Sequence, residues 1–121
     1  LISALAPAIA MGNRTVLIPS AAYPLAATDF YQVLETSDLP AGVVNIITGD
    51  HAELAPTLAA HMDLDAVWSF SSSDVSGAVE RASAGNLKRT WVNNGLAIAP
   101  TAQDYLQAAT EVKNIWIPYG E

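Results

Sequence analysis

The feature that most constrains this sequence is the alternation of short apolar runs with longer stretches of helical period. Apolar runs rich in strand-forming residues occur at 15–18, 43–47, 66–70 and 87–92, and helix-period stretches lie before and between them. Strands that alternate with helices are typical of a parallel sheet with helices on its faces. The pattern therefore predicts an α/β domain.

The expected helices have recognisable ends. Gly12 and Asn13 end a first helix over 2–11, and Pro24 begins a second that runs to about residue 37. A third begins at Asp50 and Glu53, at capping-box spacing, although Pro56 removes a backbone donor and predicts a later start or a kink. With right-handed crossovers, these elements predict a three-layer, doubly wound, Rossmann-like sandwich around one mainly parallel sheet of about four strands.

Composition limits the size of the domain and the kind of partner. The chain has 121 residues, 51% of them hydrophobic, which suffices for one core. Its net charge of −7 repels nucleic acid and anionic membranes, so neither is an expected partner. No apolar run approaches the roughly 18 residues of a spanning helix, and the start lacks the basic segment of a signal peptide, so a cytoplasmic location is expected.

The absence of cysteine limits the chemistry. It excludes a disulfide framework, a thiolate metal site and a cysteine nucleophile in these 121 residues. His51 and His61 lack the clustered partners of a metal site, so no metal is expected. The serine-rich stretch 69–76 has no glycine before Gly77 and no lysine, and a helix N-cap at Ser73 explains it better than a phosphate loop.

The sequence changes character after Asn94. Residues 1–94 hold the α/β pattern, whereas 95–121 comprise an irregular segment, a short helical stripe and an apolar run predicted to be a strand. The stripe consists of Tyr105, Leu106, Ala109 and Val112, and the apolar run of Ile115, Trp116, Ile117 and Tyr119. That run either covers the domain's own core or docks on a neighbour, and both alternatives stay open.

Several strings carry a family resemblance. They are 5–13 (LAPAIAMGN), 15–20 (TVLIPS), 24–27 (PLAA), 39–50 (LPAGVVNIITGD) and 60–67 (AHMDLDAV). In this order and spacing, over about residues 4–80, they resemble the cofactor-binding domain of the aldehyde dehydrogenase superfamily. The resemblance implies a Rossmann-like fold and NAD(P) as cofactor, with Ser20, Ser72 and Val75 at the positions that bind it.

Departures from the family pattern affect each expected cofactor contact. The family's ribose-binding lysine corresponds to Ile18, and a glycine close to the adenosine corresponds to His51. The two glycines of the phosphate loop correspond to Ser71 and Ser76. Ile18 cannot hydrogen-bond to a ribose hydroxyl, and the two loop serines add side chains where the backbone must approach the pyrophosphate. Ser72 keeps the family's phosphate-contacting hydroxyl, and weak or absent NAD binding is predicted.

The family's catalytic groups have no counterpart in this chain. Its general base corresponds to Val92, its oxyanion-binding asparagine falls before Leu1, and its cysteine domain would follow Gly95. No covalent adduct can form without the cysteine nucleophile. Residues 80–93 and 112–121 resemble instead the degenerate C-terminal half of long, two-module aldehyde dehydrogenases.

Two functions are therefore predicted, from different classes. The first is a catalytically inactive module that serves the structure or assembly of a larger aldehyde dehydrogenase. It would contact an upstream module or an identical subunit through Ile115, Trp116, Ile117 and Tyr119. The alternative is the NAD(P)-binding portion of an aldehyde dehydrogenase that oxidises aldehydes to acids, with catalytic residues outside this chain.

Overall fold

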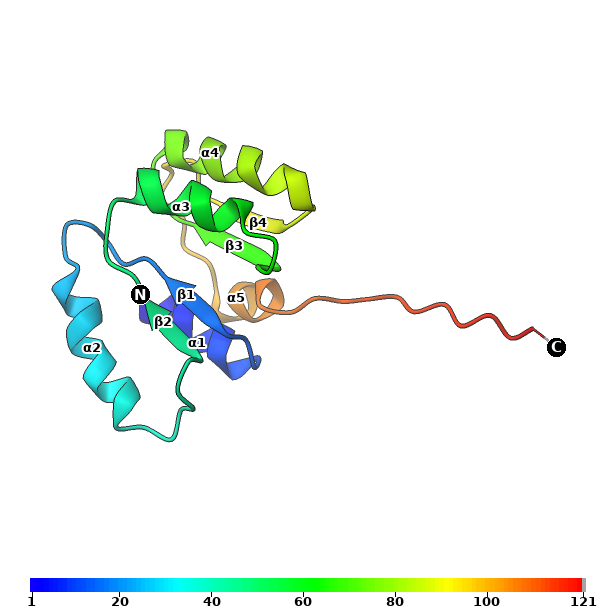
Figure 1. The fold of residues 1–121 in the computed structure, drawn as a ribbon, viewed down its shortest axis with the longest axis horizontal. Helices are drawn as coiled ribbons and strands as arrows, with labels where there is room; N and C mark the ends of the chain where they lie inside the picture. The colour runs from blue at the N-terminus through cyan, green and yellow to red at the C-terminus, as the bar shows by residue number, and fades with distance from the viewer. Residues whose placement is uncertain (121) are drawn as a thin grey trace.

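Helices and strands alternate along the chain as the sequence predicts (Figure 1). The computed structural model describes residues 1–120, and Glu121, the last residue of the 95–121 segment, lies outside the described residues. The elements are α1 (Ile2–Ala10), β1 (Thr15–Leu17), α2 (Leu25–Glu35), β2 (Val44–Ile46), α3 (His51–Ala60), β3 (Ala66–Ser69), α4 (Ser73–Ser83), the 3-10 turn η1 (Ala84–Asn86), β4 (Arg89–Val92) and α5 (Ala102–Ala108). The α/β class is confirmed.

The strands are parallel, but they do not form one sheet. β1 pairs with β2, Thr15 opposite Val44, and β3 pairs with β4, Ala66 opposite Arg89. The predicted Rossmann-like fold with mainly parallel strands is confirmed, and within the described residues its four strands form two separate two-stranded ladders. Apolar periodicity locates strands along a sequence but does not determine which strand edges meet.

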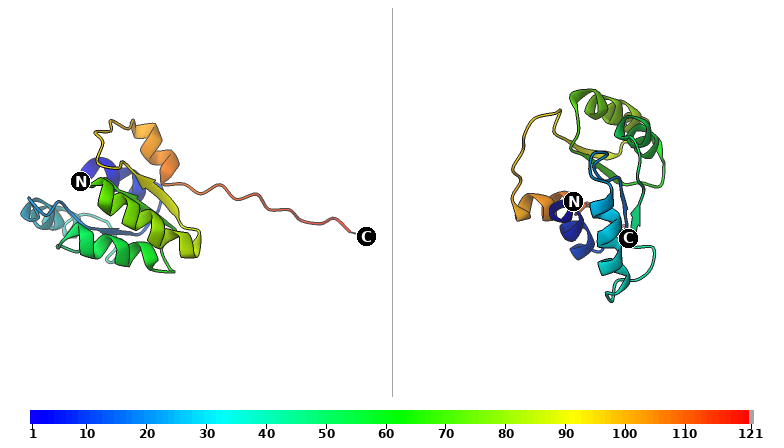
Figure 2. Two further views of the ribbon diagram at one scale, coloured as in Figure 1. Left: turned by 90° about the horizontal axis from the view of Figure 1, so that it is seen from above. Right: turned by 90° about the vertical axis from the view of Figure 1, so that its left-hand side faces the viewer.

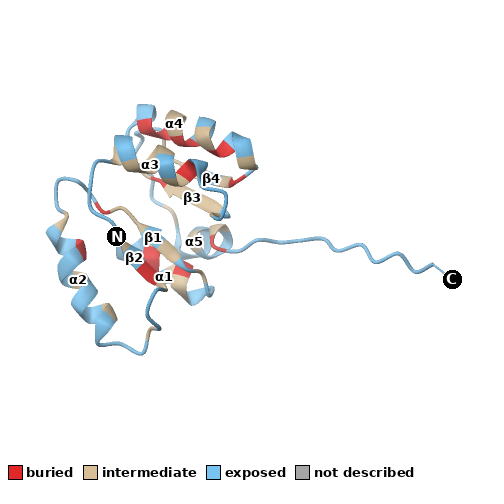
Figure 3. Cartoon of the chain, in the orientation of Figure 1, coloured by how far each residue is buried: buried red, intermediate tan, exposed pale blue. Residues whose placement is uncertain are grey.

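The main core lies between the β3–β4 ladder and the two helices α3 and α4. Ala59, Val75 and Val79 are buried there, and Val67 and Val92 of the strands pack against them. Figure 3 shows the buried residues of α4 in a row along the side that faces α3 and the strands. Aliphatic side chains on one face of each element thus hold this half of the molecule together.

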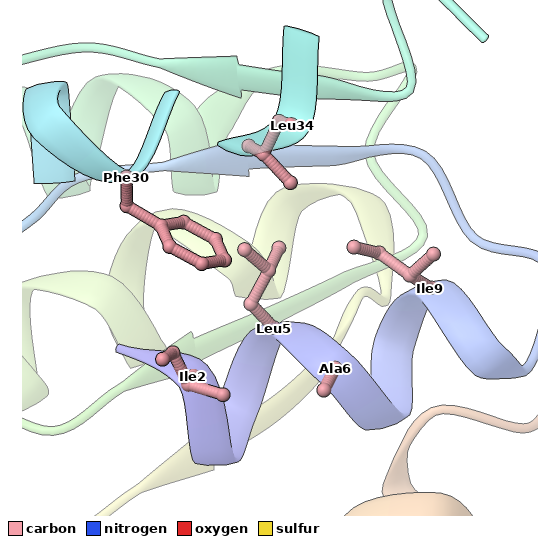
Figure 4. A pocket seen from close by; sticks show the side chains of 6 residues that line it. All are labelled: Ile2, Leu5, Ala6, Ile9, Phe30 and Leu34. Atoms are coloured by element: carbon pink, nitrogen blue, oxygen red, sulfur yellow. The ribbon is translucent and has the colours of Figure 1, made fainter. Parts of the chain in front are cut away.

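The β1–β2 ladder has its own helices, α1 and α2. Leu5 and Ala8 of α1 are buried. Phe30 and Leu34 of α2 point toward α1 across a small apolar pocket (Figure 4). Tyr31, which the helical period also places in the apolar stripe, is 46% exposed, so the buried face of α2 is narrower than its sequence predicts.

The start of α3 and the end of α5 differ from the bounds that the sequence predicts. Pro56 lies inside α3, which begins at His51 without delay and continues to Ala60. The Asp50 carboxylate accepts a hydrogen bond from the Ala52 backbone N–H at 3.0 Å and so caps the helix. Pro56 has no backbone N–H to donate, and the packing of α3 against α4 compensates for the stability lost with that hydrogen bond. The last helical stripe ends early, because α5 stops at Ala108 and Val112 lies beyond it.

Residues 110–120 leave the body of the molecule as an extended tail (Figures 1 and 2). They form neither helix nor strand, and Ile115, Trp116, Ile117 and Tyr119 are between 72% and 102% exposed. The tail does not cover the core of its own chain, so the strand expected at 115–119 is not formed in the single chain.

Candidate functional site

The carboxyl ends of β1 and β3 lie at the same edge of the molecule. The two strands of each ladder are parallel, and residues that follow β1 and β3 line one common hollow. Residues 18–20 follow β1 at this edge, and residues 70–72 follow β3. Doubly wound folds bind their ligands outside the carboxyl ends of the strands, so this edge is the candidate site.

A hollow of about 1220 Å³ lies between β1 and β3, and residues at this edge line part of it. Ile18, Ser20, His51 and Ser71 are among the residues that line its carboxyl end. Ser20 is exposed among them. Ile18 presents methyl groups, which cannot bond to a ribose hydroxyl.

His51 joins the start of α3 to the segment that follows β1. Its Nε2 atom lies 2.7 Å from the carbonyl oxygen of Pro19, and its ring is half-buried. A carbonyl oxygen only accepts, so Nε2 carries the proton and donates it. The position that corresponds to a glycine in the family is therefore occupied by an imidazole bound to the main chain.

Ser72 caps α4. Its hydroxyl oxygen accepts a hydrogen bond from the Val75 backbone N–H at 3.4 Å. The N-cap interpretation of the serine-rich stretch is confirmed, one residue earlier than the predicted Ser73. Val75 itself is buried in the core, so the structure separates its side chain from Ser20 and the hollow.

A tight turn at residues 93–96 covers the first turn of α4. Gly95 has a φ of +74°, and a Cβ atom at this position would lie 3.3 Å from the backbone nitrogen of Ser73. The Asn94 backbone N–H donates to the hydroxyl of Ser76, which is fully buried, at 3.2 Å. Helix N-terminal N–H groups are the usual ligands of a pyrophosphate. Here Gly95 lies over the Ser73 nitrogen, and the Val75 N–H is bonded to the Ser72 hydroxyl.

The residue at the position of the family's general base belongs to the core. Val92 is half-buried and packs against the cluster around Val79. It has no titratable group and is held by aliphatic neighbours. Among residues 1–120, no three His, Cys, Asp or Glu side chains lie close enough together to hold a metal ion.

An aromatic cluster was missed in the sequence. The ring centroids of Trp68 and Trp91 are 5.4 Å apart in an edge-to-face arrangement, and those of Trp91 and Tyr105 are 5.2 Å apart. Phe70 also contacts Trp91, at 5.2 Å. Side chains alternate across a strand, so this cluster lies on the face opposite Val67 and the helices α3 and α4. The i, i+2 spacing of Trp68 and Phe70 was the available signal.

Two polar side chains attach the end of α5 to the rest of the molecule. Arg89 donates from Nη1 to the carbonyl oxygens of Ala108 and Thr110, at 3.2 and 2.9 Å. Asn13 donates from Nδ2 to that of Ala109, at 2.9 Å. Helix C-terminal carbonyls lack partners within the helix, so these donors stabilise α5 while linking it to both ladders.

The fold described above defines a Rossmann-like α/β module. The sequence model of the aldehyde dehydrogenase family matches residues 1–112. The chain belongs to this family.

Individual members of the family also match the chain. The chain is 38% identical over 93 residues to NADP/NAD-dependent aldehyde dehydrogenase PuuC of Escherichia coli, and 32% identical over 91 residues to betaine aldehyde dehydrogenase of Bacillus subtilis. In both comparisons, 75% of this chain matches 19% of the relative. An aldehyde dehydrogenase crystal structure from Bartonella henselae superposes with a TM-score of 0.67 and 35% identity over 71% of this chain and 18% of that one. The chain thus spans about a fifth of the length of these relatives.

Within residues 1–120, no helix combines the length and apolar character needed to cross a membrane.

Proposed function

We propose that this chain is a catalytically inactive aldehyde dehydrogenase module that serves the structure or assembly of a larger enzyme. The observation that carries the proposal is the lack of a nucleophile and a base. The 121 residues contain no cysteine, and the base position holds Val92 in an aliphatic core. Neither a thiohemiacetal nor its deacylation by an activated water has a residue to support it.

The cofactor-side residues do not fit NAD(P). The hydroxyl of Ser72 accepts a hydrogen bond from its own helix, and Gly95 lies over the backbone of Ser73. Ile18 supplies no donor or acceptor side chain at the ribose position. These three features support weak or absent binding, and no catalytic step is assigned to this chain.

The exposed tail supports the assembly role. Ile115, Trp116 and Ile117 keep most of their apolar surface in water in the single chain. Burying such side chains against a partner is favourable, and an indole is a frequent interface anchor. We assign the tail to contact with an upstream aldehyde dehydrogenase module or an identical subunit, in an oligomer expected in the cytoplasm.

A second function is favoured by Ser20. This hydroxyl is exposed at the mouth of the hollow, at the edge where doubly wound folds bind nucleotides. A chain that still binds NAD(P) through Ser20 would act as the cofactor portion of an aldehyde dehydrogenase whose cysteine and asparagine lie elsewhere. PuuC, a relative, is an NADP/NAD-dependent enzyme.

An activity assay tests the proposal. The purified chain is mixed with aldehydes and with NAD or NADP, and reduced cofactor is followed by its absorbance. Purified PuuC serves as the positive control. No turnover above the blank is expected at any chain concentration. Turnover that rises in proportion to chain concentration, and that falls in a Ser20→Ala variant, would contradict the proposal and favour the second function.

A further inference from the structure

Leu87 has a backbone conformation that leucine rarely adopts. Its φ is +54°, in the left-handed region, and the residue is 93% exposed. It ends the 3-10 turn η1 in a conformation that glycine or asparagine usually supplies at helix ends. A bulky side chain strains the backbone in this region, and its exposure brings no packing in return. Leu87 therefore lowers the stability of the domain relative to glycine at the same position.

The neighbours of Leu87 hold it in this conformation. The Lys88 backbone N–H donates to the carbonyl oxygen of Ser83 at 3.4 Å, as in a Schellman motif. The side chains of Asn86, from Nδ2 at 3.2 Å, and of Lys88, from Nζ, both donate to the carbonyl oxygen of His61. The residues on both sides are thus fixed to the ends of α3 and α4, and the leucine between them is presented to solvent. Strained residues held in this way cluster at binding sites.

A second exposed apolar side chain lies beside the same carbonyl group. Met62 directly follows His61 and is 74% exposed. The two side-chain hydrogen bonds to His61 bring Met62 and Leu87 to the same end of the α3–α4 pair. Met62 and Leu87 together form an apolar knob on this end of the molecule.

The other half of the molecule has an apolar pocket between α1 and α2 (Figure 4). Its lining consists of apolar side chains from both helices, namely Ile2, Leu5, Ala6, Ile9, Phe30 and Leu34. Ile2 is 57% exposed and Ala6 is also exposed, so the pocket opens on the surface. Its volume is about 60 Å³. A cavity of roughly 150 Å³ accepts benzene, so this pocket is too small for an aromatic ring and suits the branched end of an aliphatic side chain.

The charges around the knob and the pocket are complementary. Arg14 is the single lysine or arginine among residues 1–80, whereas α2 carries Asp29 and Glu35. Three of the chain's five lysines and arginines lie within 81–89, next to the knob, and Arg81 among them is exposed. Complementary charges at the rim of a contact steer its approach and orientation more than they raise its affinity.

We propose that the apolar knob of one chain binds the α1–α2 pocket of a second copy, with Leu87 as the residue that enters the pocket. The knob and the pocket lie on different halves of the molecule, so the contact is head-to-tail and can continue from copy to copy. A contact centred on two side chains is smaller than the roughly 1,200 Å² of a stable interface, so the association is weak. It does not use the tail, and it does not depend on whether the module is catalytically inactive or binds NAD.

A mixture of two differently labelled chains tests the inference. One chain is unlabelled and carries a nitroxide on Gly85→Cys, beside the knob, where φ is not positive and no atom lies within 4 Å of a Cβ. The chain has no other cysteine, so the nitroxide has one site of attachment. The second chain has the native sequence and carries isotope labels, and NMR follows the broadening of its methyl signals. We expect broadening that grows with the nitroxide chain's concentration and is strongest at the pocket residues Ile2, Leu5, Ile9 and Leu34.

Variants at Leu87 separate binding from folding. Glycine adopts the left-handed conformation without strain, so Leu87→Gly in the nitroxide chain should raise the unfolding midpoint and abolish the broadening at the pocket. Leu87→Met is the matched control, because it keeps an apolar side chain and should keep the broadening. Ala6→Leu in the isotope-labelled chain fills the pocket and should abolish the broadening without a change to the knob.

Four results would overturn the inference. The first is a mixture without broadening at the pocket, or with equal broadening at the core residue Val79. The second is a Leu87→Gly chain that still broadens the pocket signals. The third is a lower unfolding midpoint in Leu87→Gly, since the leucine would then serve the fold. The fourth is loss of the pocket broadening in Trp116→Ala, because the tail would then be the occupant.

Discussion

The imidazole of His51 donates a hydrogen bond to the carbonyl oxygen of Pro19, 2.7 Å away, and so joins helix α3 to the segment after β1. α3 packs with α4 on the β3–β4 ladder, whereas Pro19 directly follows the β1–β2 ladder. The bond therefore bridges the two halves of the molecule at the candidate site. An imidazole bound to the protein's own main chain thus occupies this position.

Removal of this bond should destabilise the domain. His51→Ala is expected to lower the free energy of unfolding by about 1 kcal/mol, the usual net contribution of a hydrogen bond of this kind. Urea denaturation followed by circular dichroism measures it. His61→Ala is the control, because the exposed His61 ring accepts only from the nearby Asp63 backbone N–H. Equal losses of unfolding free energy in the two variants would show that the His51–Pro19 hydrogen bond adds no stability of its own.

The contact between Gly95 and the start of α4 predicts a graded glycine series. Gly95→Ala should cost about 1 to 3 kcal/mol, because φ is +74° and the new Cβ would lie 3.3 Å from the Ser73 nitrogen. Gly42→Ala, with a φ of +82° and nothing within 4 Å, should show the backbone strain alone. Gly85 has no positive φ, and no atom lies within 4 Å of a Cβ placed there. Gly85→Ala should therefore change stability by less than about 0.5 kcal/mol. A loss at Gly95 no larger than that at Gly42 would refute the close contact.

The capping box of α5 predicts a pH dependence. The Thr101 backbone N–H and then its hydroxyl hydrogen-bond the Asp104 carboxylate, and they hold the pKa of Asp104 below its ordinary value of 3.8. A carboxylate with a lowered pKa in the folded state contributes stability above the unfolded pKa and loses it as the pH falls through the folded pKa. Wild type should therefore exceed Asp104→Asn in unfolding free energy near neutral pH, and the difference should shrink below pH 3.8. Urea titrations across this range measure it, and a difference independent of pH would contradict the assignment.

The exposed tail predicts that truncation changes association and leaves the fold intact. A chain that ends at Asn114 should keep the circular dichroism spectrum and unfolding midpoint of the intact chain, because residues 115–119 make no core. Light scattering should show a smaller mass than for the intact chain, alone or with an active aldehyde dehydrogenase module. Trp116→Ala in the intact chain should weaken association, often by about 2 kcal/mol for an anchor residue. A monomeric intact chain that unfolds on truncation would show that the tail is core.

The sequence predicted the elements better than their arrangement. The β-branched run that contains Val16 and the cap at Asp50 are local signals, and both hold in the structure. The division into two ladders could not be predicted, because pairing depends on which edges meet, and β1 meets no edge of β3. The late start or kink predicted at Pro56 does not occur, because α3 packs on α4 and is helical from His51 to Ala60.

The same limit applies to the candidate site. The position of Ser20 near the end of a strand could be predicted because it comes three residues after Leu17, and the capping role of the serine-rich stretch because it precedes a helix. The cover of Ser73 by Gly95 joins residues distant in sequence, and it depends on the turn formed after β4. No local pattern contains such a contact. The burial of Val75 follows in the same way from the packing of α4 on α3.

Calorimetric titration with NAD tests the central claim, that the chain has lost cofactor binding as well as catalysis. Each lost hydrogen bond to a charged group costs about 1.5 to 3 kcal/mol, and about 1.4 kcal/mol is a factor of ten in affinity. Two or three such losses, at Ile18, His51 and the covered start of α4, predict no saturable heat up to about 1 mM NAD, whereas PuuC measured alongside should saturate. A dissociation constant of about 1 μM that weakens in Ser20→Ala and Ser72→Ala would contradict the account and return the chain to the functional cofactor binders.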